Sequence, residues 1–155
     1  MMQSKEQGFT LIELVAVILI VALLSSLATY SSRVLFDGNI RSYASQFATV
    51  VREIKNNTLV SSEGGWTIRL GKQSENYYWE VWKDSNRVQI CKLPKNVEVY
   101  KNDILISNSI EDVEFYPSTG KVKSGYGDYL FKSTITGKEI HVQIIKNTGG
   151  VLVDD

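Results

Sequence analysis

The sequence predicts an α+β protein in which a long N-terminal helix packs against an antiparallel β-sheet head. Up to about residue 59, apolar residues recur at intervals of three and four. From Gly65 onward, β-branched and aromatic residues alternate with polar ones. A helix that precedes a run of antiparallel strands is the element order of α+β proteins. The 155 residues suffice for one domain with a short appendage.

The composition disfavours several classes of protein. The 17 basic and 17 acidic residues give a formal net charge of zero, which disfavours binding to nucleic acid by bulk electrostatics, so DNA is a conceivable partner without support. The single cysteine, Cys91, cannot form an internal disulfide. One histidine and one cysteine leave few ligands for zinc or copper, so neither a metal nor another cofactor is expected.

The first element is an apolar segment from Phe9 to Ala28, in which Leu14–Leu24 is apolar without a break. Twenty helical residues rise about 30 Å, the hydrocarbon thickness of a bilayer. Lys5 precedes the segment and Arg33 follows it. We therefore expect residues 9–30 to form a single membrane-spanning helix, with the head, residues 60–155, outside the cytoplasm.

Glu13 is the one charged residue inside this apolar segment. A carboxylate near the centre of a membrane helix costs roughly 2.5–3.5 kcal/mol, and less near an edge. Two explanations stay open. The side chain either reaches the lipid headgroups or meets a positive charge inside a protein–protein contact.

A cleavable secretory signal is an alternative interpretation of the same segment. Ser26-Leu27-Ala28 has small residues at the spacing of a signal-peptidase site. Against it, Lys5 and Glu6 cancel each other in the leader, and Glu13 interrupts the apolar core. On this interpretation the chain is a secreted or membrane-anchored binding domain with no filament role.

Gly8-Phe9-Thr10-Leu11-Ile12-Glu13-Leu14 resembles the processing motif of type IV prepilins and type II secretion pseudopilins. The resemblance implies that prepilin peptidase removes residues 1–8 by cutting between Gly8 and Phe9, and that Phe9 is then N-methylated. It also implies a pilin-like fold and a structural subunit rather than an enzyme. The subunit would serve in a type IV pilus or a pseudopilus for secretion, adhesion, motility or DNA uptake.

The same resemblance gives Glu13 a partner. Cleavage creates an ammonium group on Phe9, and the carboxylate of one subunit would face this amine on a neighbour. At low effective dielectric such a pair attracts strongly, whereas either charge alone is penalised. The implied partners are other pilin or pseudopilin subunits, a membrane platform protein, a motor ATPase, and the lipid bilayer before assembly.

Residues 31–59 are predicted to continue the helix as an amphipathic segment that packs on the head. The helix is expected to end near Asn56-Asn57-Thr58, before a turn at Gly64-Gly65, and Gly38 weakens it locally. The apolar stripe consists of residues at helical spacing: Leu35, Phe36, Ile40, Tyr43, Ala44, Phe47, Val50, Val51 and Ile54.

Residues 60–155 are predicted to form the β-rich head, with turns at Asp84-Ser85-Asn86, Thr136-Gly137 and Gly149-Gly150. The expected strands are Trp66–Leu70, Tyr77–Trp82, Arg87–Lys92, Val97–Tyr100, Ile104–Ile106, Val113–Tyr116, Asp128–Thr134, Lys138–Ile145 and Val151–Val153.

The C-terminal third resembles the ending of minor pseudopilins of the GspH/FimT type. The resemblance rests on Phe115-Tyr116-Pro117-Ser118-Thr119-Gly120, on a strand at Ile140–Ile144, and on Thr148-Gly149-Gly150-Val151. These residues are also ordinary hairpin signals. Residues 60–110 resemble no family.

No catalytic constellation is evident in the sequence. His141 alternates with apolar residues in a predicted strand, so we expect a surface histidine without a convergent acid or nucleophile. An enzyme would require His141 beside a carboxylate, or Cys91 in a pocket, whereas Cys91 is expected to pack as a small hydrophobe. The acidic pairs Glu111-Asp112 and Asp154-Asp155 lack the pattern of a calcium loop.

The segment Tyr77–Lys83 is aromatic on both faces of a strand. Alternation places Tyr77 and Trp79 on one face, and Tyr78 and Trp82 on the other. One face is expected to join the core. The face with Tyr78 and Trp82 has two possible roles. It is either covered by the amphipathic helix of residues 31–59 or by a loop, or it is a contact surface for another subunit, a receptor or single-stranded DNA.

Overall fold

The computed structural model describes residues 11–61, 65–107 and 109–155, and the side chains of these residues except 26–38. The chain divides into two compact units, Met1–Leu35 and Phe36–Asp155. The predicted leader, residues 1–8, lies outside the described residues.

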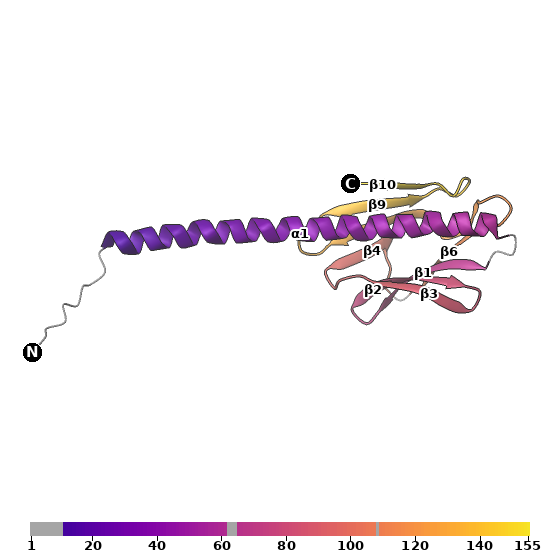
Figure 1. Ribbon diagram of the computed structural model, residues 1–155, viewed down its shortest axis with the longest axis horizontal. Helices are drawn as coiled ribbons and strands as arrows, with labels where there is room; N and C mark the ends of the chain where they lie inside the picture. The colour runs from indigo at the N-terminus through magenta and orange to yellow at the C-terminus, as the bar shows by residue number, and fades with distance from the viewer. Residues whose placement is uncertain (1–10, 62–64, 108) are drawn as a thin grey trace, which may run out of the picture. The chain divides into compact units, whose positions relative to one another are not determined.

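The predicted helix is confirmed as α1, Leu11–Val60, which contains 50 residues (Figure 1). It ends one residue later than expected and is followed by a turn in which the Ser61 amide donates to the Asn57 carbonyl. Gly38 does not interrupt the helix. The chain has no proline before Pro94, so no backbone amide is missing from the helical ladder.

The head contains two five-stranded antiparallel sheets, which we call the first and second sheet. The first has the order β3-β2-β1-β6-β7 and the second the order β10-β9-β8-β4-β5. The strands are β1 Trp66–Gln73, β2 Asn76–Lys83, β3 Asn86–Lys92, β4 Val97–Lys101, β5 Ile104–Leu105, β6 Glu111–Phe115, β7 Val122–Ser124, β8 Gly127–Ser133, β9 Glu139–Ile144 and β10 Val151–Asp154.

The α+β class is confirmed, and each of the nine expected strands has a counterpart in the head. The prediction missed β7, a three-residue strand that pairs with β6 next to Gly125. So short a strand gives too few alternating positions for a pattern. The strand expected at Ile104–Ile106 is the two-residue β5, Ile104–Leu105. It follows a turn at Asn102 and Asp103 and pairs with the end of β4.

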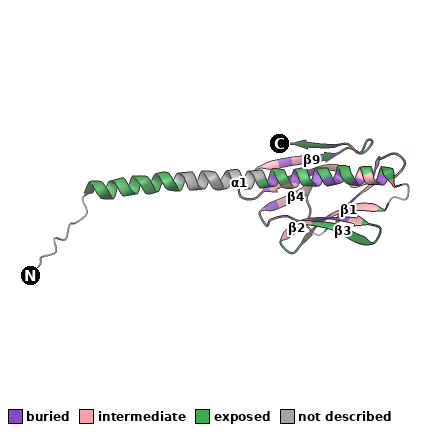
Figure 2. Ribbon diagram, viewed as in Figure 1, coloured by how far each residue is buried: buried purple, intermediate pink, exposed green. Residues whose placement is uncertain are grey.

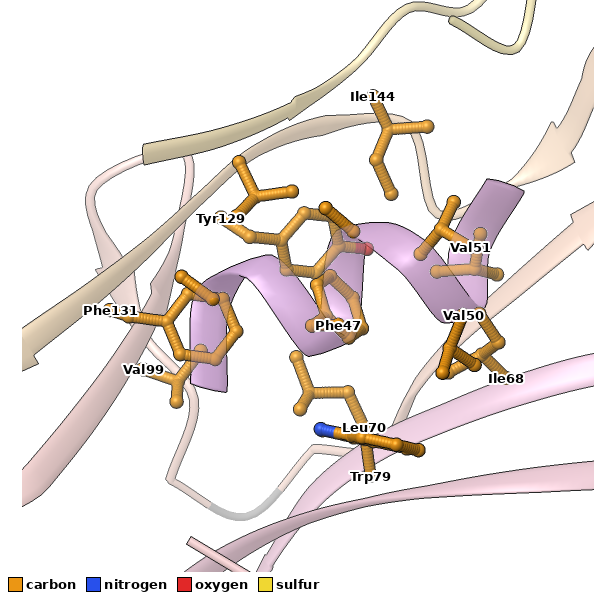
Figure 3. Close-up of a cluster of buried hydrophobic side chains, with 14 of the residues drawn as sticks. Phe47, Val50, Val51, Ile68, Leu70, Trp79, Val99, Tyr129, Phe131 and Ile144 are labelled. Atoms are coloured by element: carbon orange, nitrogen blue, oxygen red, sulfur yellow. The ribbon is translucent and has the colours of Figure 1, made fainter. Parts of the chain in front are cut away.

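The second half of α1 packs against both sheets and completes one hydrophobic core. Figure 2 shows its buried residues on one side of the helix, as the amphipathic pattern predicted. Phe47 is fully buried, and its ring centroid lies 5.4 Å from that of Tyr129 and 5.6 Å from that of Phe131. Figure 3 shows Leu70 and Trp79 of the first sheet on the other side of Phe47. The helix therefore joins the two sheets through a shared core.

Two turns from the C-terminal third meet beside the end of α1. Gly120 and Gly149 both have positive φ, at 64° and 61°. A Cβ on Gly149 would lie 2.3 Å from the Gly120 carbonyl oxygen, a distance that no real Cβ contact shows. Lys55 of α1 binds the turn that contains Gly149, because its Nζ donates to the Thr148 carbonyl at 2.8 Å. The two glycine motifs thus form one contact.

Candidate functional site

The first part of α1, from Leu11 to Ser25, exposes its apolar side chains. Every described side chain from Leu11 to Ser25 is exposed, including Leu11 at 82% and Ile12 at 75% (Figure 2). The Ser25 hydroxyl donates to the Val21 carbonyl at 2.7 Å, so the helix satisfies this polar group itself. An apolar surface of this extent is typical of a site that contacts either lipid or the helices of other subunits.

Glu13 lies in the first turn of α1. Its carboxylate is thus near the positive end of the helix dipole, which favours an anion by about 0.3–1 kcal/mol. The other two residues of the predicted processing site, Gly8 and Phe9, lie outside the described residues.

Across the described residues, no helix combines the length and the apolar character that crossing a membrane requires.

Tyr78 and Trp82 lie on the outer face of the first sheet, as strand alternation predicted. Both are half-buried, whereas Tyr77 and Trp79 on the inner face are 2% and 1% exposed. The second half of α1 does not cover this outer face, because it packs on the inner faces of the sheets. Tyr78 lies instead over Gly71, where a Cβ would be 3.1 Å from the Tyr78 hydroxyl oxygen.

A charged network holds Trp82 on this face. Glu80 is a buried residue, with 7% of its surface exposed. Its carboxylate accepts hydrogen bonds from Trp82 Nε1 and from Arg87 Nη1, both at 2.9 Å. The Arg69 guanidinium lies 5.2 Å from the Trp82 ring centroid and binds Asp112 at 3.1 Å. Side chains of the sheet itself therefore hold the Trp82 ring, and both Tyr78 and Trp82 remain partly accessible.

His141 does have a neighbouring carboxylate, so the expectation of no convergent acid was wrong. Its Nδ1 lies 2.6 Å from Asp128 Oδ2, in a hollow of about 570 Å³ that Gln143, Leu152, Val153 and Asp154 also line. The β8–β9 hairpin brings the pair together, and the Thr136-Gly137 turn was the signal that could have found Asp128. The side chains that line this hollow include no hydroxyl, thiol or amine. Among the described residues that line the hollow, no nucleophile accompanies the pair.

The other candidate residues have structural surroundings. Cys91 is half-buried against the core, and burial raises the pKa of its thiol, which makes it less reactive. Glu111 and Asp112 bind Lys101 and Arg69, and Asp155 binds Arg41 at 2.8 Å. Within the described ranges, no three histidine, cysteine or acidic side chains are grouped so that they could hold a metal ion.

The N-terminal segment is the part of the chain with a match among known families. Residues 3–29 match the model of the prokaryotic N-terminal methylation motif. The matched residues include Gly8, Phe9 and Glu13. No curated protein and no solved structure is similar enough to the chain to count as a match.

The match supports a prepilin-type signal, the kind that pilins and pseudopilins carry. It suggests a structural subunit rather than an enzyme, and it implies processing by prepilin peptidase and assembly with other pilins. The unit of residues 36–155, which includes the head, shares no part of the match.

Proposed function

We propose that this chain is a structural subunit of a type IV pilus or pseudopilus, cut between Gly8 and Phe9 and methylated on the new N-terminus. The observation that carries the proposal is the methylation motif at residues 3–29, which continues into a helix with exposed apolar side chains. A filament core of packed helices would cover that surface. The bilayer would cover it before assembly, with the helix of residues 9–30 crossing the membrane once.

Glu13 is the residue to which we assign the register of assembly. Its carboxylate would pair with the Phe9 ammonium of a neighbouring subunit, because either charge alone would be costly inside a core of apolar helices. A platform protein and a motor ATPase would drive extrusion, and the head would then lie outside the cell or in the periplasm.

We also propose that the head is that of a minor subunit of the GspH/FimT type. Support comes from the contact between the two C-terminal glycine motifs, in which Gly149 approaches the Gly120 carbonyl beside Lys55. The paired β8–β9 hairpin between these motifs agrees with the same pattern.

The outer face with Tyr78 and Trp82 is our candidate for contact with another subunit. Support comes from the partial exposure of both rings and from the contacts of Trp82 with Glu80 and Arg69, because a side chain that is already held in place loses little entropy when it binds.

The processing step can be tested by changing Gly8 to valine in the full-length chain. A branched side chain would block the close approach of the peptidase to the backbone, so the uncut precursor should accumulate, with less than about a tenth of the chain processed. The matched control is Gln7→Val, which places the same valine side chain one residue earlier in the chain. Immunoblots of membrane fractions separate precursor from product. Normal processing of Gly8→Val would refute cleavage at this position.

A further inference from the structure

Three segments meet where the second half of α1 ends, within the unit 36–155, and they carry an excess of positive charge. They are residues 55–61, residues 116–126, which include β7, and residues 145–150 between β9 and β10. The contact of Gly149 with the Gly120 carbonyl holds the second and third segments together. The three segments contain no acidic residue and four lysines: Lys55, Lys121, Lys123 and Lys146. We call this surface the basic end.

Two ammonium groups of the basic end have no carboxylate partner. Lys121 and Lys146 are exposed, and neither forms an ion pair with another described residue. The Lys146 ammonium lies 4.6 Å from the Tyr126 ring centroid, and such a contact leaves its charge in place. Lys123 differs, because it binds Glu114 at 2.7 Å. The basic end is therefore complementary to a surface with uncompensated carboxylates.

The hollow beside His141 is a surface of this kind. It lies on the outer face of the second sheet, and its described lining includes Asp128 and Asp154 but no lysine or arginine. Asp128 binds His141 at 2.6 Å, whereas Asp154 makes no ion pair with a described residue. Leu152 supplies an apolar wall. A lysine side chain fits this lining, because its aliphatic stem packs on apolar surface while its ammonium binds a carboxylate.

The basic end and the hollow do not neutralise each other within one copy. No ion pair joins them in the part of the chain that the structure describes. Lys121 follows Gly120, which lies against the Leu59 side chain of α1, whereas the hollow lies on the face of the second sheet that points away from α1. A contact between two different surfaces of the same chain is heterologous, and it joins copies head to tail into an open array.

We propose that the basic end of one copy docks on the hollow of a second copy, with Lys121 bound to Asp154. The second copy is the occupant because this chain supplies both halves of the contact, two uncompensated ammonium groups and a hollow with two carboxylates. The inference rests on the proposed function, since a filament holds its subunits side by side. At the resulting effective concentration, an ion pair that is weak alone contributes to assembly.

The test places the photo-cross-linker benzoylphenylalanine at Gln143 of the full-length chain in living cells. Gln143 is exposed, uncharged and part of the lining of the hollow, so this change leaves both carboxylates in place. Irradiation should give an adduct with twice the mass of the chain, which maps by mass spectrometry to residues 116–126 or 145–150. The same cross-linker at Gln89, an exposed residue of β3, is the positional control and should give no such adduct.

Charge reversal tests the pairing of Lys121 with Asp154. Lys121→Glu and Asp154→Lys should each reduce the adduct at least about tenfold, because each change brings like charges together. The double variant exchanges the two charges and should restore at least about half of the wild-type yield. Lys92→Glu, the same change at an exposed lysine of β3, is the matched control and should alter the yield less than about twofold.

Several outcomes would overturn the proposal: absence of the adduct, an adduct with a different protein, or a double variant whose yield stays as low as that of the single variants. A chain that is cut before Phe9 but gives no adduct would refute this contact and leave the proposed function standing. A chain that keeps residues 1–8 and still gives the adduct would support the contact and refute the proposed processing.

Discussion

Changing Glu13 to alanine is expected to leave cleavage intact and to reduce incorporation into filaments by about a hundredfold or more. On the proposed pairing, the variant would leave the Phe9 ammonium of the neighbouring subunit without its carboxylate, and breaking a buried ion pair in this way costs about 3–5 kcal/mol. Each 1.4 kcal/mol corresponds to a factor of ten. The measurement compares the chain in sheared filaments with the chain in the membrane fraction by quantitative immunoblot.

Ser25→Ala is the matched control for Glu13→Ala. Ser25 lies on the same helix, and its hydroxyl bonds to the helix's own Val21 carbonyl, so its loss should change incorporation less than about twofold. Wild-type incorporation of Glu13→Ala would show that Glu13 does not set the register. Loss of cleavage in this variant would place Glu13 in peptidase recognition instead.

The largest expected effect on the stability of the head comes from Gly149→Ala. The added Cβ would lie 2.3 Å from the Gly120 carbonyl oxygen, at a φ of 61° that disfavours L side chains. The two turns would have to separate beside Lys55. We expect the free energy of unfolding to fall by about 3 kcal/mol, measured by urea denaturation of residues 36–155.

Gly137→Ala isolates the steric part of this effect. Gly137 has a similar φ of 74°, but a Cβ there would meet nothing within 4 Å. In this variant, backbone strain alone should lower the free energy of unfolding, by about 1 kcal/mol. Equal losses for the two variants would mean that the contact between Gly149 and Gly120 contributes nothing to stability.

Local patterns predicted most of the fold. The apolar stripe around Phe47 and the alternation of Tyr77 to Lys83 repeat within a few residues, so they report α1 and β2 directly. The contact of Gly120 with Gly149 and the pairing of His141 with Asp128 depend on how hairpins align. Strand register is set by tertiary packing, which a single sequence does not show.

The candidate site divides in the same way. Gly8, Phe9 and Glu13 lie within one short stretch of sequence that matches the methylation motif, so sequence alone suffices to recognise it. The network of Arg69, Glu80 and Arg87 spans three strands. The indole Nε1 of Trp79 is buried and has no acceptor among the described residues, which is evident only once the positions of its neighbours are known.

Determining the first residue of the mature protein tests this account most directly. Purified from the filament or membrane fraction, the chain should begin at residue 9, with a mass increment for one methyl group on its amine. A chain that begins at Thr29, or one that keeps residues 1–8, would contradict it.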